Sequence, residues 1–287
     1  MIAVFKHELR SYFHSLTAYL FIAFMLLFVG IGAMLYNIQS AVANFEYVLE
    51  FVCIGLVVII PVLTMRVISE EKKQKTDQLL YSLPLKTGEI VLGKYSALLV
   101  IFLIPVAIIA AYPLIFAQYG EVYLPTSYGS LLAFFFLGAA LIAIGTFVSS
   151  LTENQGFAAG ISIPVLLFNY YSVKLADYMS STALGSAIGL TVLIAAVAWI
   201  IRNLTRNGAL AWGIGAAGIA GILALSRFNS EALEGLLPDI MSKLSLFERF
   251  YVFVDGVFDI TSLVFFTTVI IFFLFLSIQS MEKRRYN

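Results

Sequence analysis

The chain has 287 residues, of which 61% are hydrophobic and only 12% are charged. Soluble domains carry about a quarter charged residues, so this composition excludes an ordinary soluble protein. We expect no nucleic acid partner, and the formal net charge of +0 by itself says nothing about partners.

Eight stretches of 15 to 31 residues contain no Asp, Glu, Lys or Arg. A helix needs about 20 apolar residues to cross ~30 Å of hydrocarbon, and most of the stretches reach that length. Helices are expected rather than strands, because backbone groups in lipid must be satisfied within the segment. The eight predicted spans are Leu16 to Tyr36, Phe51 to Met65, Ser96 to Tyr119, Val122 to Thr152, Asn154 to Val173, Tyr178 to Ile201, Asn207 to Ser226 and Ile260 to Met281.

The second predicted span is the shortest. Phe51 to Met65 crosses the membrane only if Tyr47 to Leu49 join the helix, which places Glu50 inside its outer end. An acid at this depth requires a local tilt or a buried partner. We expect Glu50 to be interfacial, and the alternative is a member of a proton relay.

Basic residues are distributed unequally between the two sides of the membrane. With the N-terminus inside and eight crossings, thirteen of the 17 Lys and Arg residues fall on the inner side. Cytoplasmic loops of membrane proteins carry such an excess. Both termini are therefore predicted to be cytoplasmic, in a multi-pass protein of the cell membrane. The four outer residues are Lys174, Arg227, Lys243 and Arg249.

One partial match to a phosphate-binding loop lies before the third span. Gly88, Gly93 and Lys94 fit the GxxxxGK[ST] pattern, but Tyr95 replaces the hydroxyl residue that binds magnesium. The pattern also needs a preceding buried strand, whereas Thr87 is expected here to cap a helix that contains these residues. We therefore predict no nucleotide site in this chain.

The chain has two histidines, His7 and His14, which are too far apart along one helix to hold the same metal ion. No GxSxG or HExxH motif and no Cys and His cluster occurs in the sequence. We expect a non-catalytic chain with no cofactor or metal of its own.

Glycines recur at helical spacing in the later spans, where they let helix backbones approach closely. Packing inside the chain is the favoured interpretation, and a seam between two copies is the alternative. The glycines are Gly156 and Gly160, Gly185 and Gly189, and the run Gly213, Gly215, Gly218 and Gly221.

The charged segment between the second and third spans, residues 67–94, has the pattern of a docking helix. Ser69 is expected to cap a helix from Glu70 to Leu83, where Glu70 and Glu71 favour the positive end of the helix dipole. Pro84 ends this helix. An apolar edge on a short helix below the membrane suits a cleft in a soluble partner, and the alternative is a solvated hairpin. The edge consists of Leu79, Leu80 and Leu83.

This segment resembles the cytoplasmic loop of type-2 ABC transporter permeases, which shows an acidic pair, a Thr, a Leu pair, a Pro and a Gly-Lys pair in that order. Phe5 to Ser15 is similar to the interfacial elbow helix of that family, and Ser149 to Gly156 to its loop between the fourth and fifth spans. Leu244 to Asp259, followed by a span and Glu282 to Arg285, resembles the gliding-motility-type branch. The matching loop residues are Glu70, Glu71, Thr76, Leu79, Leu80, Pro84, Gly93 and Lys94.

The resemblance implies an all-α polytopic helical bundle in which residues 1–287 form a single permease domain. Residues 1–15 would form the elbow helix and residues 67–94 the cytoplasmic coupling segment. The family core has six spans, so the extra pair is placed between Asn154 and Ser226. The ATPase-coupling residues would be Glu70, Glu71, Thr76, Leu79, Leu80, Leu83 and Pro84.

The resemblance also implies partners and a function. The chain would pair with a second permease, identical or homologous, and with cytoplasmic ABC ATPase subunits that bind ATP and Mg. Export is the usual direction in the family. Two alternatives stay open: a stand-alone secondary carrier, and a membrane subunit that transmits ATPase motion to an extracytoplasmic partner.

The segment 227–259 is predicted to lie outside the cytoplasm. Apolar residues recur at helical spacing from Leu233 to Phe258, which predicts amphipathic helices on the outer leaflet, one starting near Pro238. This segment is either a cap without ligand contact or a surface for a partner or a lipid.

Overall fold

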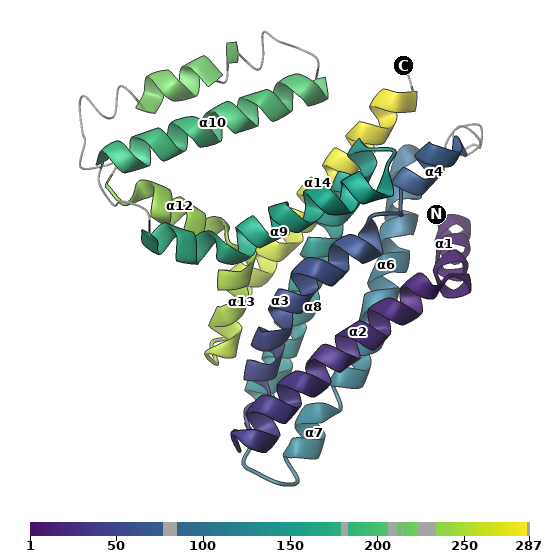
Figure 1. The fold of residues 1–287 in the computed structure, drawn as a ribbon, viewed down its shortest axis with the longest axis vertical. Coiled ribbons are helices and arrows are strands. Elements are labelled where there is room, and N and C mark those ends of the chain that lie inside the picture. Colours follow the sequence, from purple (N-terminus) through teal and green to yellow (C-terminus); the bar gives the residue numbers. More distant parts are fainter. Residues whose placement is uncertain (77–84, 179–182, 206–211, 214, 223–233, 286–287) are drawn as a thin grey trace. The chain divides into compact units, whose positions relative to one another are not determined.

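The computed structural model describes residues 1–76, 85–178, 183–205, 212–213, 215–222 and 234–285, and the regular structure within these ranges is helical (Figure 1). The chain divides into two compact units, of which unit 1 comprises Met1–Phe168 and Arg249–Asn287, and unit 2 comprises Asn169–Glu248. The elements are α1 (Ile2–His14), α2 (Leu16–Gly32), the π-helix η1 (Ala33–Gln39), α3 (Glu46–Thr64), α4 (Ser69–Gln74), α6 (Thr87–Ile109), α7 (Tyr112–Phe116), α8 (Leu124–Leu151), α9 (Gln155–Tyr178), α10 (Ala183–Thr205), α12 (Leu236–Leu244), α13 (Leu246–Val254) and α14 (Ile260–Arg285).

Five helical stretches in the described part of the chain are long and apolar enough to cross a membrane. They confirm the prediction of a polytopic helical membrane protein. Helices α9 and α10 cover two more of the predicted spans, and Asn207 to Ser226 falls only partly within the described residues. The count of eight spans goes beyond the five and stays a prediction. The five are Leu16–Gln39, Glu46–Gln74, Thr87–Phe116, Leu124–Leu151 and Ile260–Arg284.

Helix α8 is the centre of unit 1, because α3, α6 and α14 all pack against it (Figure 1). Two of its glycines permit this packing. A Cβ at Gly138 would lie 2.2 Å from the ring of Phe102 on α6, and a Cβ at Gly145 would lie 2.2 Å from Oγ1 of Thr64 on α3. Sequence analysis singled out other glycines, and one of them, Gly160, has no neighbour within 4 Å of an added Cβ.

The N-terminal end of α3 confirms one expectation and contains a buried acid that was not expected. The helix begins at Glu46, so Tyr47 to Leu49 join the span as predicted. Glu50 is exposed, whereas Glu46 is only 2% exposed and accepts a hydrogen bond of 2.8 Å from Oγ of Ser127 on α8. The buried acid of this span is therefore Glu46, which sequence analysis missed.

Unit 2 contains α10 and α12, which pack against each other. Leu237 and Met241 of α12 are buried and contact Leu190 of α10. Gly189 makes room for this contact, because a Cβ there would lie 2.2 Å from Leu237. The helix predicted to start near Pro238 is confirmed, and it begins two residues earlier, at Leu236. Its placement on the outer leaflet stays a prediction.

Candidate functional site

The helix predicted from Glu70 to Leu83 is shorter than expected. Helix α4 ends at Gln74, and Lys75 adopts a left-handed conformation with φ of 58°. The backbone N–H of Thr76 donates to the carbonyl of Glu71 at 3.0 Å, which closes the helix end. The predicted docking residues Leu79, Leu80, Leu83 and Pro84 lie outside the described residues.

Both predicted N-caps are wrong. Ser69 is the first residue of α4 rather than its cap, and its hydroxyl donates to the carbonyl of Met65. Thr87 is likewise the first residue of α6. The backbone N–H of Lys86 donates to the carboxylate of Glu89 at 3.2 Å, so a capping-box contact begins this helix.

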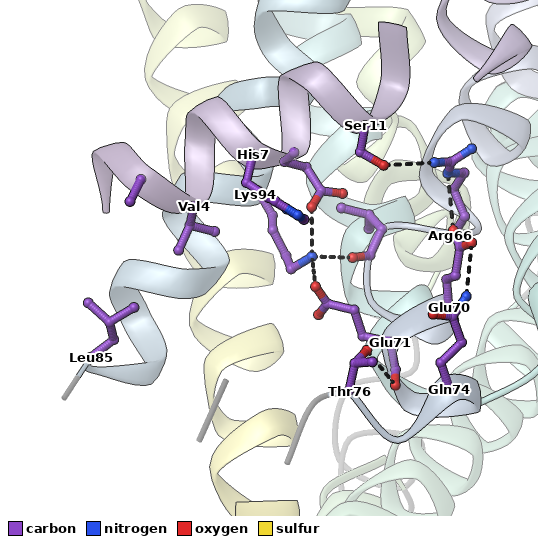
Figure 2. Close-up of a pocket in the computed structure, with 13 residues that line it drawn as sticks. Val4, His7, Ser11, Arg66, Glu70, Glu71, Gln74, Thr76, Leu85 and Lys94 are labelled. Carbon is purple, nitrogen blue, oxygen red and sulfur yellow. Dashed lines mark hydrogen bonds and ion pairs between the residues drawn. The ribbon is translucent and has the colours of Figure 1, made fainter. Parts of the chain in front are cut away.

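Lys94 joins three segments of unit 1 through its ammonium group (Figure 2). The side chain is 1% exposed. Its Nζ donates to Oε2 of Glu8 on α1 at 2.9 Å, to Oε1 of Glu71 on α4 at 2.7 Å and to the carbonyl of Val67 at 2.9 Å. An ammonium has three donors, so all of them are used. The buried lysine therefore ties α1 and α4 to the start of α6.

The neighbouring Gly93 explains why α1 can approach α6 so closely. A Cβ at Gly93 would lie 3.1 Å from the carbonyl oxygen of Met1 and 3.1 Å from Cβ of Val4. The Gly-Lys pair thus lets the backbones of α1 and α6 come close together and buries a charge beside this contact. Both residues lie within α6 and contribute to its packing against α1.

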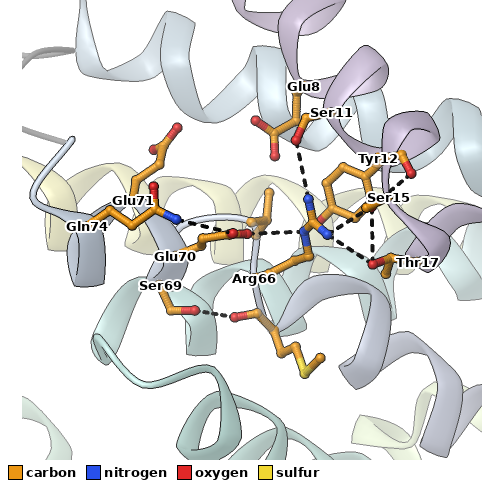
Figure 3. Close-up of polar contacts among 12 residues, drawn as sticks. Glu8, Ser11, Tyr12, Ser15, Thr17, Arg66, Ser69, Glu70, Glu71 and Gln74 are labelled. Carbon is orange, nitrogen blue, oxygen red and sulfur yellow. Dashed lines mark hydrogen bonds and ion pairs between the residues drawn. The ribbon is translucent and has the colours of Figure 1, made fainter.

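Arg66 forms the second half of the charge cluster (Figure 3). Its Nε lies 3.2 Å from Oε2 of Glu70, and its guanidinium carbon lies 4.6 Å from the centre of the Tyr12 ring. These contacts connect the junction of α1 and α2 to α4. Its terminal nitrogens donate to three hydroxyl groups, those of Ser11, Ser15 and Thr17, at 2.9 to 3.3 Å.

A cavity of about 720 Å³ lies between α1, α4 and the start of α6 (Figure 2). Its polar wall is the charge cluster itself, and its apolar wall includes Val4, Val67 and Leu85. Oε2 of Glu71 is buried and has no hydrogen-bond partner within the described residues. The three carboxylates of Glu8, Glu70 and Glu71 exceed the two cations, so the wall is acidic.

The cluster changes the interpretation of the predicted acidic pair. Glu70 and Glu71 are predicted ATPase-coupling residues, and within the chain each of them contacts a basic group, Arg66 and Lys94 respectively. Sequence analysis missed Glu8 and Arg66 as members. The signal for Glu8 is its spacing, because Val4, Glu8 and Tyr12 recur every four residues and are the buried residues of α1.

Helix α14 reaches the same end of unit 1. Arg284 forms an ion pair of 2.5 Å with Glu153 in the connection between α8 and α9. The hydrogen bond and charge of Arg284 lower the pKa of the Glu153 carboxyl from its usual value. The end of α14 is therefore fixed beside the end of α8.

Five apolar helical stretches of membrane-spanning length among the described residues define this chain as a polytopic helical membrane protein. The family model described as ABC-2 family transporter protein matches residues 2–282. The chain therefore belongs to the ABC-2 transporter family, which confirms the predicted resemblance to type-2 permeases at the level of the family. Comparison with curated proteins finds no match.

Proposed function

We propose that this chain is the transmembrane subunit of an ABC exporter, driven by ATP hydrolysis on separate cytoplasmic ATPase subunits. The chain itself is non-catalytic, and ATP and Mg bind to the partner. One observation carries the proposal beyond family membership: the short helix α4 is tied by buried charges to two other helices, α1 and α6. A solvated hairpin has no need of such contacts.

The buried contacts supply a physical means of coupling. Breaking a buried ion pair by removing one partner costs about 3–5 kcal/mol, so α4 cannot move far without moving α1 and α6. Lys94 makes this connection through Glu8 and Glu71, and Arg66 extends it to the start of α2. A force applied to α4 by an ATPase would thus reach the spans directly.

The residues that contact the ATPase are proposed to follow α4. Glu70 and Glu71 hold α4 in place, and Thr76 closes its end. Leu79, Leu80, Leu83 and Pro84 supply the apolar edge that enters the partner. The acids are assigned to the fold and the apolar edge to the partner, because acids already paired within the chain contribute less binding free energy to a partner than an apolar edge does.

The remaining features of the proposal concern the assembly in the membrane. Residues 1–15 form an interfacial elbow helix, and α1 supports this because its buried residues share one face. A second copy or a homologue completes the permease, with eight spans and both termini in the cytoplasm of the cell. The resemblance of Leu244 to Asp259 and of Glu282 to Arg285 supports the proposal that the chain belongs to the gliding-motility-type branch.

A second function is favoured by α12, whose apolar residues lie on one side. The chain would then transmit ATPase motion to an extracytoplasmic partner or lipid through residues 227–259, without moving a solute. A stand-alone carrier is less well supported, because the described spans do not place paired acids at depth. ATP-dependent solute flux in vesicles separates transport from transmission.

The proposal is tested by co-purification of the ATPase with tagged variants at equal membrane abundance. Burial of one leucine contributes about 1.5–3 kcal/mol, so Leu80→Asp should abolish the complex. Lys73→Met, at an exposed position of α4, should leave the complex intact. If Asp is tolerated at Leu79, Leu80 and Leu83 without loss of the ATPase, the proposed coupling segment is wrong.

A further inference from the structure

The start of α4 is capped by a residue from another helix. Its own N-cap residue, Ile68, has no side chain that can accept a hydrogen bond. Oγ of Ser149 on α8 accepts the backbone N–H groups of Ile68 and Ser69, both at 3.2 Å, and donates to the carbonyl of Met65 at 3.1 Å. Ile68, Ser69 and Ser149 are all buried. The hydroxyl of Ser149 therefore performs the capping that the local sequence cannot.

The next residue on α8, Ser150, makes two further contacts. The carbonyl of Ser150 accepts from Nζ of Lys72 on α4 and, at 3.0 Å, from Oγ of Ser280 on α14. Ser149 thus contacts the start of α4, and Ser150 contacts both the middle of α4 and α14. These contacts are separate from the Lys94 cluster, which connects α4 to α1 and α6.

We infer that Ser149 is a positioning residue, through which displacement of α4 is delivered to α8 and α14. This inference rests on the proposed function, because the displacement is the one that an ATPase would cause. Separation of α4 from α8 would strip two buried N–H groups of their acceptor, and buried backbone donors are paired almost without exception. The inner ends of α4 and α8 therefore move together, and α14 follows through Ser150.

The chain offers a matched control on the same helix. Ser130 also lies on α8, is also fully buried, and donates one hydrogen bond of 2.9 Å to the carbonyl of Phe253. It has no contact with α4. Ser130→Ala therefore removes a comparable hydroxyl from the same helix and leaves the cap in place, whereas Ser149→Ala removes the cap.

The first measurement is hydrogen–deuterium exchange on the purified chain in lipid nanodiscs. Ser149→Ala should raise the exchange rates of the Ile68 and Ser69 amides about tenfold or more, since two hydrogen bonds are lost. Ser130→Ala should leave these two rates within about twofold of wild type. Equal rates in the two variants would show that Ser149 does not hold α4, and would overturn the inference.

The second measurement repeats the exchange on the complex with its ATPase, with and without ATP. Wild type and Ser130→Ala should show an ATP-dependent change at the inner ends of α8 and α14. Ser149→Ala should reduce this change while α1 and α6 still respond, because only the contact of Lys72 with Ser150 then connects α4 to α8. A change at α8 and α14 that is as large in Ser149→Ala as in Ser130→Ala overturns the inference and leaves the proposed function intact. If the wild-type complex shows no ATP-dependent change in any span, the proposed function itself fails.

Discussion

Replacement of the buried lysine tests the energetics of the charge cluster. In Lys94→Met the carboxylates of Glu8 and Glu71 remain, with side chains only 10% and 21% exposed, and lose their shared cation. Truncation of one partner in a buried ion pair typically costs about 3–5 kcal/mol. We expect a loss of unfolding free energy in that range, although methionine fills most of the same volume.

The compensating variants separate charge from packing. Replacement of a whole buried ionic group by neutral residues is often neutral or stabilising. The triple variant Lys94→Met, Glu8→Gln, Glu71→Gln should therefore recover at least about half of the loss. Lys73→Met is the control at an exposed lysine, and it should change stability by no more than about 0.5 kcal/mol.

The assay is equilibrium unfolding of the purified variants in one detergent, with membrane abundance as a second readout. A Lys94→Met variant as stable as Lys73→Met would refute the reasoning, because the ammonium would then contribute nothing to the fold. A triple variant no better than Lys94→Met would assign the loss to packing instead of charge.

Two further predictions concern packing and pH. Gly138→Ala should destabilise the protein by about 1–3 kcal/mol, because its Cβ would overlap an aromatic ring. Gly160→Ala is the control, because the space around its added Cβ is open, and it should not destabilise the protein. Thermal unfolding of both variants provides the comparison. The lowered pKa of Glu153 means that its pair with Arg284 stabilises the protein fully above the ordinary carboxyl pKa of 4.5, and that this contribution is lost as pH falls through the lowered folded-state pKa. Unfolding measured from pH about 6 to about 3 should therefore show a smaller acid-dependent loss in Arg284→Gln than in wild type; an identical pH profile would contradict the assignment.

The spans could be predicted from the sequence because charge-free length is a local property. Three of the five helical stretches of spanning length begin and end within three residues of the predicted limits, whereas Glu46–Gln74 ends nine residues beyond Met65 and Thr87–Phe116 begins nine residues before Ser96. The inclusion of Tyr47 to Leu49 in α3 also followed from length alone. The position of the buried acid did not, because Glu46 lies beside Ser127 only through the packing of α3 on α8.

The candidate site was predicted only in part, for a related reason. Glu70 and Glu71 were recognised from their order in the chain. The pair of Glu70 with Arg66 is a local contact at i,i+4 spacing, which sequence analysis overlooked, whereas the pair of Glu71 with Lys94 depends on how α4 and α6 meet. Lys94 and Glu8 are 86 residues apart in sequence, and no local pattern connects them. Long-range ion pairs of this kind need the fold before they can be assigned.

The caps and the end of α4 show the limit of helix propensity rules. Ser69 fits the preferred N-cap residue types, yet Ser149 from another helix takes that function. The run after Glu71 contains Lys72, Lys73 and Lys75, and α4 stops within it, at a residue in the left-handed conformation. Most helical stability comes from packing of an apolar face, and this run has none to bury.

The central claim is that ATP hydrolysis on a separate subunit is coupled to these spans through residues 67–94. The most direct measurement is ATP hydrolysis by the partner ATPase, alone and with this chain in lipid nanodiscs. We predict that the wild-type chain changes the hydrolysis rate severalfold and that Lys73→Met does the same. With Leu80→Asp, the rate should equal that of the ATPase without the chain. The central claim would be contradicted if the ATPase binds the chain but hydrolyses ATP at the same rate in three cases: with the wild-type chain, with Leu80→Asp and without any chain.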